Sequence, residues 1–354
     1  MSGRTTQVGP YRLLGKLGKG GMATVFHALD TRSGLQVALK ILLPQFYNDT
    51  NYVKRFTKEG NNTRRLRHPH IVRTLDAGVA DGYYFISMEL VDNGTLDRYV
   101  QLRGGKLPLD EVLYIISQIG QALDYAHSLG YIHRDIKPNN ILCTTDGRYM
   151  LSDFGIAKHL SNDITMMTVG ASIGTPSYMS PEQARSERTV NHRSDIYSLG
   201  VLTYRLLTGE FPFQAKEPYE LVHKIIYQNP IDPRHFNPQV PECVAQAIMR
   251  VLTKDPEERY DTCEGFVNGL RSYTQPESLF GQMGAQIVAT IQSSLGLGWR
   301  SIRLARGFKS RQSPPPITGS HHLQLEVPRI RPTGQIAIGI VSITLMAIWL
   351  LALL

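Results

Sequence analysis

The hydrophobic periodicity of the chain changes near Gly94, and this change limits the possible folds more than any other feature. Before Gly94, short apolar segments are separated by glycines or by turn sequences such as DTRSG, a pattern typical of β-strands. A helical pattern containing Val53, Phe56 and Leu66 interrupts them. The strand candidates are YRLLGKLGKGG, ATVFHALD, LQVALKILL, IVRTLDAGVA and YYFISMELV.

After Gly94, apolar residues recur at spacings of three and four. The segment LDEVLYIISQIGQALDYAHSLG keeps this spacing over about five turns and predicts a long amphipathic helix. Further helical segments run from Asp195 to Leu207 and from Glu242 to Leu252. No internal repeat is visible, which disfavours solenoids and propellers. The sequence therefore predicts an α+β fold with a small β-rich lobe followed by a larger α-rich lobe.

The C-terminal segment Ile336–Leu354 contains 19 residues and no charge. A bilayer requires roughly 20 apolar residues in a helix, and a buried helix of this length would normally carry a polar face. We therefore expect a single transmembrane helix here. Arg329 and Arg331 precede it, so the positive-inside rule places the preceding protein in the cytoplasm. The first residues lack the apolar region of a signal peptide, which agrees with this location.

The positive charge is concentrated in the region before this segment. From Thr274 onward, seven Lys and Arg oppose two Glu, a net charge of +5 within the total of +8. A basic tail favours contact with a membrane surface over nucleic-acid binding, which would place the charge on the folded part. Arg300, Arg303, Arg306 and Lys309 recur at every third residue, with apolar residues between them. This spacing is compatible with a solvated linker or with an interfacial helix on anionic lipid, and both alternatives stay open.

The three cysteines are Cys143, Cys243 and Cys263. They are scattered, contain no CxxC pair and leave an odd count, so the spacing indicates neither a disulfide framework nor a zinc site. A reducing compartment fits best. With 354 residues and 42% hydrophobic content, the chain can bury one large core or two modest lobes.

A glycine-rich segment, GKGGMATV, lies between the first two strand candidates. Glycines let backbone amides approach phosphate oxygens that a side chain would block. The segment is not a Walker A loop, because no GK[ST] sequence and no helix follow. Fifteen residues after Val25, Lys40 lies on a strand, and Glu59 lies on the next helix. A lysine held by a helical carboxylate could bind nucleotide phosphates.

The stretch YIHRDIKPNNILC gathers charged and amide side chains between apolar residues. A predicted hairpin, NILCTTDGRYMLSD, would fold back so that Asp135, Asn140 and Asp153 converge. Two carboxylates and an amide oxygen are the hard oxygen ligands that Mg²⁺ requires beside a triphosphate. Lys137 would add positive charge for the transferred phosphoryl group.

Together these motifs resemble those of the eukaryotic-like protein kinase family. Their sequences are most similar to those of bacterial Hanks-type serine/threonine kinases. The similarity includes GKGGMATV, VALK, HRDIKPNN, DFG and GTPSYMSPEQ, and extends over about Tyr11 to Leu270. Asp195 resembles the structural aspartate of the large lobe, and Arg259 resembles the partner of Glu182. The resemblance implies a bilobal kinase fold. Its expected parts are an N-terminal tail (1–10), a catalytic domain (11–273) with N-lobe 11–91 and C-lobe 92–273, a basic juxtamembrane linker (274–334) and a transmembrane helix (335–354).

The resemblance also implies catalytic roles. Asp135 would accept or orient the substrate hydroxyl proton, Lys137 would stabilise the moving phosphoryl group, and Asn140 with Asp153 would hold Mg²⁺ or Mn²⁺. Lys40, paired with Glu59, would bind the α- and β-phosphates of ATP. The nucleotide-binding positions that the resemblance implies are Leu17, Gly18, Lys19, Gly20, Gly21, Met22, Ala23, Thr24, Val25, Ala38, Lys40, Glu59, Met88, Glu89, Val91, Leu142 and Asp153.

The resemblance further implies serine and threonine acceptors, because Lys137 and Thr175 differ from the pattern of tyrosine kinases. Arg134 is the residue that in the family pairs with a phosphate on the activation segment. The candidate phosphate acceptors between Asp153 and Glu182 are Ser161, Thr165, Thr168 and Ser172. We hypothesise autophosphorylation at Thr165 or Thr168.

One departure from the family pattern is visible, since Ala23 replaces the third glycine of GxGxxG. Alanine keeps the loop small and narrows its φ range, so we expect a stiffer loop that remains active. No catalytic position is substituted, which argues against a pseudokinase scaffold. The GTPSYMSPEQ segment argues against a small-molecule phosphotransferase. The expected partners are protein substrates, membrane lipid and a second copy for autophosphorylation in trans, although no residue is diagnostic of a dimer.

Overall fold

The computed structural model describes residues 6–154, 176–187 and 190–272. All of them fall within one compact unit, residues 1–293. The predicted transmembrane helix, the basic linker and the candidate phosphorylation sites lie outside the described residues. Within the described ranges, no helix has both the length and the apolar character needed to cross a membrane.

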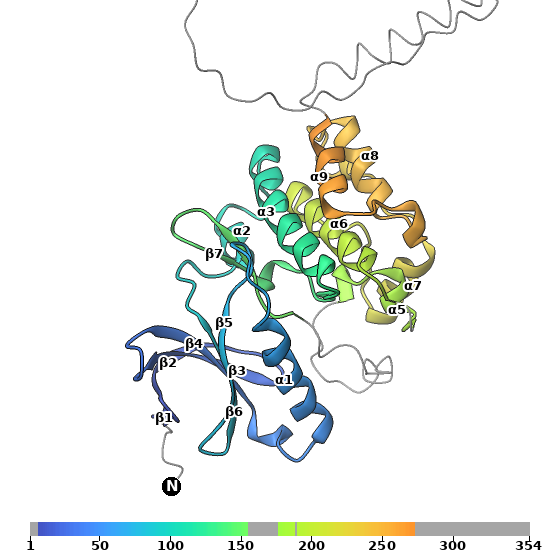
Figure 1. Ribbon diagram of the computed structural model, residues 1–354. Helices are drawn as coiled ribbons and strands as arrows, with labels where there is room; N and C mark the ends of the chain where they lie inside the picture. The colour runs from blue at the N-terminus through green and yellow to red at the C-terminus, as the bar shows by residue number, and fades with distance from the viewer. Residues whose placement is uncertain (1–5, 155–175, 188–189, 273–354) are drawn as a thin grey trace, which may run out of the picture. The chain divides into compact units, whose positions relative to one another are not determined.

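The first lobe is an antiparallel sheet of six strands in the order β1-β2-β3-β4-β6-β5 (Figure 1). The five long strands match the five predicted strand segments, because each carries the apolar and β-branched residues that a half-buried sheet requires. The segment predicted as an N-terminal tail contributes the additional strand β1, which pairs with the start of β2. The strands are β1 (Gln7–Val8), β2 (Tyr11–Lys19), β3 (Ala23–Asp30), β4 (Gln36–Leu42), β5 (Thr74–Ala80) and β6 (Tyr83–Glu89).

Helix α1 (Thr50–Thr63) packs against this sheet (Figure 1). The Asp49 side chain caps its N-terminus by accepting the backbone N–H of Asn51 at 2.9 Å. Phe56 is buried with apolar residues of β4 and β6. At Gly60 an added Cβ would lie 2.6 Å from the Cβ of Ala77, so only glycine permits this close approach. Leu66, which the pattern placed with this helix, lies beyond its end and joins the core of the second lobe.

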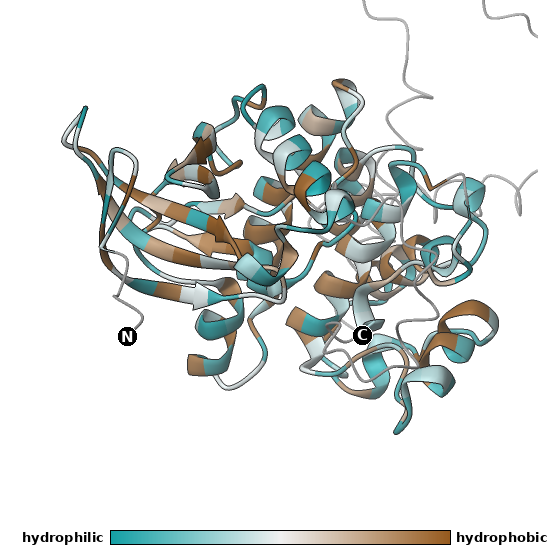
Figure 2. Ribbon diagram, turned by 90° about the horizontal axis from the view of Figure 1, so that it is seen from below, coloured by the Kyte–Doolittle hydropathy of each residue, from teal (hydrophilic) through white to brown (hydrophobic). Residues whose placement is uncertain are grey.

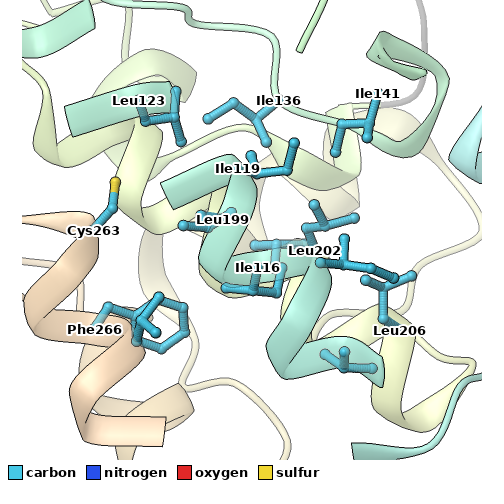
Figure 3. Close-up of a cluster of buried hydrophobic side chains, with 14 of the residues drawn as sticks. Ile116, Ile119, Leu123, Ile136, Ile141, Leu199, Leu202, Leu206, Cys263 and Phe266 are labelled. Atoms are coloured by element: carbon cyan, nitrogen blue, oxygen red, sulfur yellow. The ribbon is translucent and has the colours of Figure 1, made fainter. Parts of the chain in front are cut away.

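The second lobe is predominantly helical. Its core centres on α3 and α6, whose apolar faces contact each other and α9 (Figure 3). The long predicted helix is α3, and the two shorter predictions correspond to α6 and α8. The helices are α2 (Leu96–Leu102), α3 (Leu109–Ser128), α5 (Pro181–Ala184), α6 (Arg193–Thr208), α7 (Pro218–Tyr227), α8 (Glu242–Val251) and α9 (Cys263–Arg271).

A short hairpin joins the two parts of the predicted site. Strands β7 (Ile141–Cys143) and β8 (Tyr149–Leu151) pair as predicted, with Ile141 opposite Leu151. Gly147 in the turn has φ of +82°, the left-handed region that favours glycine. Both lobes contain hydrophobic and hydrophilic residues along their strands and helices (Figure 2). The architecture is bilobal, with a β-sheet lobe followed by a helical lobe.

Candidate active site

The glycine-rich segment forms the connection between β2 and β3. Gly18 lies opposite Val25 and Lys19 opposite Thr24, while Gly20 donates its N–H to the Ala23 carbonyl at 2.8 Å. A Cβ added at Gly18 or Gly21 would meet no atom within 4 Å, and neither residue has a positive φ. Neither crowding within the protein nor backbone conformation therefore requires glycine at these two positions.

Lys40 lies on β4 opposite Val25 and bridges two carboxylates from distant segments. Its Nζ lies 2.7 Å from Glu59 Oε1 on α1 and 2.7 Å from Asp153 Oδ1. Lys40 and Glu59 are buried, whereas the Asp153 side chain is 41% exposed. The predicted pair with Glu59 is thus present, and Asp153 adds a second carboxylate that the sequence did not indicate.

The charges of this triad shift one another. Burial alone would lower the pKa of Lys40, but the neighbouring Asp153 and Glu59 carboxylates outweigh it and raise the pKa. The Lys40 ammonium holds the pKa of Asp153 below its usual value. Burial raises the pKa of Glu59, and the Lys40 charge opposes that rise. An ammonium and an ionised Asp153 therefore face each other at the boundary between the lobes.

The segment around Asp135 forms a second polar cluster. Lys137 Nζ donates to Asp135 Oδ2 at 2.8 Å, and Asn140 Nδ2 donates to the same carboxylate oxygen at 3.0 Å. Asn140 Nδ2 also donates to the Asp135 carbonyl at 2.8 Å. A short 3-10 turn, Pro138–Asn140, brings the amide back onto Asp135. Since its nitrogen is used twice as a donor, the amide oxygen of Asn140 is the atom left to accept or ligate.

Asp153 is held next to this cluster by the hairpin. The Ser152 N–H donates to the Asn140 carbonyl at 2.8 Å. This bond links the residue before Asp153 to Asn140, the other candidate metal ligand. Asp153 itself has φ of +55°, which is uncommon for a residue with a Cβ. The hairpin thus connects Asn140 directly to the strand end that presents Asp153. The nearby Asp135 charge opposes part of the lowering of the Asp153 pKa that Lys40 causes.

His133 supports the backbone of Asp135 and was not singled out in the sequence. Its ring is fully buried, with Nε2 at 2.9 Å from the Ser152 carbonyl and Nδ1 accepting the Asp135 N–H at 3.2 Å. These two contacts require a neutral ring that carries its proton on Nε2. Burial lowers the pKa of His133, which favours that neutral form. In the sequence, the only indication of a role for His133 was its position directly before Arg134 in the charged stretch.

The predicted adenine-contact positions come from both lobes. Ala38 on β4 lies opposite Met88 on β6, Val25 lies on β3, and Leu142 lies on β7. Leu17 on β2 is 54% exposed.

The segment after β6 is fixed by backbone hydrogen bonds. Glu89 donates its N–H to the Arg73 carbonyl at 2.9 Å, so this N–H is already engaged and cannot serve a ligand. The Glu89 side chain accepts the Arg73 N–H in return. Asn93 and Gly94 then pair with Cys143 of β7. These bonds fix the segment that leads from β6 to the helical lobe, and the adenine contacts that the resemblance implies for Glu89 to Val91 stay a prediction.

Asp195, at the start of α6, organises the segment before Asp135. Its fully buried carboxylate accepts the backbone N–H groups of His133 and Arg134, each at 2.7 Å. His127 Nε2 contacts the same carboxylate at 2.8 Å. Burial would raise the pKa of Asp195, but the His127 hydrogen bond and the backbone donors outweigh it and lower the pKa. Arg134 has φ of +67°, so these bonds hold a strained backbone conformation.

Glu182 on α5 and Arg259 form a buried ion pair in the helical lobe. Arg259 donates to both carboxylate oxygens, at 2.8 and 2.9 Å, in the bidentate geometry that arginine favours. The side chains are 3% and 0% exposed. Burial raises the pKa of Glu182, but the hydrogen bonds and charge of Arg259 outweigh it and lower the pKa. The structure thus contains the pair that the sequence suggested. Thr165, Thr168, Ser172 and Thr175 lie outside the described residues.

Comparison with known proteins identifies the family. Residues 11–268 match the protein kinase domain. The chain belongs to the protein kinase family. Serine/threonine-protein kinase PrkC of Bacillus subtilis is 39% identical over 256 residues, covering 72% of this chain and 39% of that protein. Serine/threonine-protein kinase PknB of Mycobacterium leprae is 37% identical over 256 residues, covering 71% of this chain and 41% of that protein.

The kinase fold is also found in solved structures. The crystal structure of the Mycobacterium tuberculosis PknI kinase domain gives a TM-score of 0.61 at 28% identity and covers 77% of this chain and 99% of the solved one. The chain spans about two fifths of the length of the curated relatives it matches. The matched part is therefore a kinase domain of the serine/threonine type.

Protein kinases use ATP with Mg²⁺ or Mn²⁺. The residues present fit such an ion, because the Asn140 amide oxygen and the partly exposed Asp153 carboxylate are hard oxygen donors. A bound ion would neutralise the phosphate charges that approach Asp135.

Proposed function

We propose that this chain is a serine/threonine protein kinase that transfers the γ-phosphate of ATP to hydroxyl groups of proteins. The observation that carries the proposal is Lys40, whose Nζ lies 2.7 Å from both Glu59 and Asp153. This arrangement joins Lys40, the proposed phosphate-binding residue of the β-sheet lobe, to Asp153, the candidate metal ligand that follows the β7–β8 hairpin of the helical lobe. A structural salt bridge would need only one carboxylate.

Asp135 acts as the base in this mechanism. Its carboxylate takes the proton of the acceptor hydroxyl while the hydroxyl oxygen bonds to the γ-phosphorus and the bond to the β,γ-bridging oxygen breaks, releasing ADP. The hydrogen bonds from Lys137 and Asn140 orient the carboxylate. Lys137 also places positive charge beside the transferred group.

Lys40 positions the nucleotide. Its ammonium binds the α- and β-phosphates, and Glu59 holds the four-carbon side chain in place. Asn140 and Asp153 hold the divalent ion. The open space at Gly18 and Gly21 supports close approach of the loop backbone to the phosphates, since nothing within the described protein requires glycine there.

The adenine ring lies between residues of both lobes. Leu17, Val25, Ala38 and Leu142 contact its faces, and Met88 lies at the gatekeeper position. The Glu89 carbonyl and the Val91 N–H hydrogen bond to its edge. The engagement of the Glu89 N–H with the Arg73 carbonyl is compatible with this assignment, which uses no N–H of Glu89.

We further propose that the kinase autophosphorylates its activation segment at Thr165 or Thr168, in trans within a homodimer. The buried Arg134 supports the proposal, because among the described residues no side-chain hydrogen bond or ion pair involves its guanidinium. Burial lowers the pKa of Arg134, a sign that the charge lacks full compensation. A phosphate dianion opposite Arg134 would supply it. Thr175 would help to select serine and threonine acceptors.

The C-terminal apolar segment supports a location at the cytoplasmic face of a membrane. Residues 335–354 would span the bilayer and the basic linker 274–334 would contact anionic lipid, so that the kinase signals at the membrane. Extraction of membranes containing the full chain tests this location. Release by high salt or alkali without detergent would overturn it.

Transfer of labelled γ-phosphate tests the catalytic proposal. The full chain and the Asp135→Asn variant are incubated with labelled ATP and Mg²⁺, and the phosphorylated residues are mapped. We expect label on serine or threonine of the wild type alone, including the segment 161–172. Equal absence of label from both proteins, with ATP still bound, would favour the pseudokinase scaffold. Label that spares the activation segment would contradict only the autophosphorylation site.

A further inference from the structure

Three potential metal ligands meet where α3 contacts the start of α9, away from the nucleotide site. Asp124 and His127 are three residues apart on α3, so their side chains share one face of that helix. Cys263 is the first residue of α9. A carboxylate oxygen, a ring nitrogen and the sulfur of these residues lie within 4.8 Å of one another. Figure 3 shows Cys263 at the end of α9, close to α3.

His127 provides an independent sign of a ligand. Its side chain is only 9% exposed, and its Nε2 is occupied by Asp195 at 2.8 Å. Its Nδ1 is buried and has no hydrogen-bond partner among the described residues. Buried polar atoms without a partner are rare and costly, so the free nitrogen requires an explanation.

The cluster has one structural role in the fold, which is to cap α9, and that role does not involve His127 Nδ1. Asp124 caps α9 by accepting the N–H groups of Cys263 and Glu264, each at 2.9 Å. Each carboxylate oxygen has a second lone pair, one of which accepts the Cys263 thiol and becomes available when that thiol is deprotonated, so the cap and a metal bond can coexist. The helix cap therefore explains Asp124 but leaves His127 Nδ1 unexplained.

We propose that Asp124, His127 and Cys263 form a binding site for a zinc-like divalent ion. One thiolate, one imidazole and one carboxylate match the ligands that Zn²⁺ selects, and a sulfur ligand disfavours Mg²⁺. In a tetrahedral site, neighbouring ligand atoms lie roughly 3.3–3.8 Å apart, so side-chain rotation must close the cluster by no more than about 1.5 Å. The fourth position would be taken by water.

Binding requires the Cys263 thiol to lose its proton to solvent as the metal–sulfur bond forms. Burial raises the pKa of this thiol well above its usual value, and the neighbouring Asp124 adds to the shift. A coordinated ion reverses that preference, because it stabilises the thiolate directly. The cysteine spacing gave no sign of such a site, since its ligands come from segments 136 to 139 residues apart in the sequence.

The ion would be linked to the catalytic segment through His127. The ring would bind the metal through Nδ1 and hydrogen bond Asp195 through Nε2, the carboxylate–histidine–metal arrangement common in metal sites. Asp195 in turn holds the N–H groups of His133 and Arg134. Metal binding and the conformation of the segment before Asp135 are therefore thermodynamically coupled.

Titration of the full, metal-free chain with Co²⁺ tests the site, because a cobalt–thiolate bond produces a near-ultraviolet charge-transfer band. We expect one equivalent to produce the band and Zn²⁺ to abolish it by displacement. Cys263→Ala should lose the band, and His127→Gln should weaken Co²⁺ binding roughly 10–100-fold. Cys243→Ser is the matched control, since the half-buried Cys243 lies outside the cluster, and it should retain the band.

Thermal unfolding of each metal-free variant separates loss of a ligand from loss of the fold. A wild-type chain without a charge-transfer band would overturn the proposal, and this result needs no variant. A band that persists in Cys263→Ala and disappears in Cys243→Ser would overturn it equally, because the thiolate ligand would then be the wrong cysteine.

Discussion

Asp195 Oδ1 accepts the backbone N–H of Arg134 at 2.7 Å, although 61 residues separate them in the chain. The same carboxylate also accepts the N–H of His133. One buried side chain therefore holds the backbone that leads into Asp135, including the left-handed conformation of Arg134. The shape of the catalytic segment depends on α6 as much as on its own residues.

Replacing Asp195 by asparagine should disturb this segment. The amide retains one acceptor oxygen but turns its NH₂ group toward a backbone donor, and a hydrogen bond to a charged group contributes roughly 1.5–3 kcal/mol. We expect the free energy of unfolding to fall by about 3 kcal/mol and kcat to fall at least roughly tenfold. Urea denaturation and steady-state kinetics measure both. Unchanged kcat in a destabilised variant would restrict Asp195 to a structural role.

Replacing Glu59 by glutamine should weaken nucleotide use. Lys40 would keep Asp153 but lose the buried carboxylate that fixes its side chain. We expect kcat/KM for ATP to fall roughly 10–100-fold, which corresponds to about 1.4–2.7 kcal/mol. Glu220→Gln is the control, because Glu220 pairs with Lys224 on the exposed surface of α7 and should leave the kinetics unchanged. Wild-type kinetics in Glu59→Gln would refute the assigned role.

Replacing Arg259 by methionine should destabilise the helical lobe strongly. The change leaves the Glu182 carboxylate buried without a counter-ion, which typically costs about 3–5 kcal/mol. Arg234→Met removes an exposed pair with Asp232 and should cost less than about 1 kcal/mol. Chemical denaturation compares the two.

The double variant Glu182→Gln and Arg259→Met provides a further check on the same pair. Because no buried charge remains, it should recover part of the stability lost in Arg259→Met. If the loss of stability in the double variant equals the sum of the losses in Glu182→Gln and Arg259→Met, the two side chains are energetically independent.

The buried His133 predicts a decline of stability in mild acid. Its folded pKa lies below the ordinary value near 6.5, so the unfolded chain binds more protons just below that pH. The stabilising contribution is therefore complete above about pH 6.5 and is lost as the pH falls below it, at up to about 1.4 kcal/mol per pH unit. Protonated Nδ1 would also face the N–H of Asp135.

Unfolding free energies between pH 7.5 and 5.5 check this expectation in the wild type and in His133→Phe. The variant should show a shallower dependence on pH. A residual slope is expected in both, because burial also lowers the pKa of His68 and His70. Identical slopes would mean that His133 does not contribute.

Expectations from the sequence were accurate where a feature depends on neighbouring residues and failed where it depends on contacts between distant segments. The long strands, α3 and the hairpin after Asn140 were predictable because their apolar spacing and turn residues act within a few positions. The two-residue β1 and the seven-residue α2 were not predicted, since such lengths contain too few apolar repeats to show a period. Helices α7 and α9 were also missed, although α8, with the same ten-residue length as α7, was predicted. Leu66 was placed with α1 because its spacing continues the helical pattern, whereas it packs in the core of the second lobe.

Close approach between helices was equally hidden. At Gly200 an added Cβ would overlap Val251 Cγ1, so the contact of α6 with α8 depends on a missing side chain. Nothing near Gly200 in the chain indicates that contact. The second carboxylate at Lys40 is a similar case, because Asp153 lies 113 residues further along the chain.

The local sequence patterns determine which parts of the chain are β-rich and which are helical, since periodicity and turn chemistry are properties of neighbouring residues. The sequences of the motifs determine the family. Packing determines which charges meet. Lys40 contacts Asp153, Asp195 holds Arg134, and Cys263 lies beside His127 because separate elements bury a common core and bring buried polar groups to one place. Such groups must find partners once water is excluded, and their partners depend on the arrangement of the whole fold.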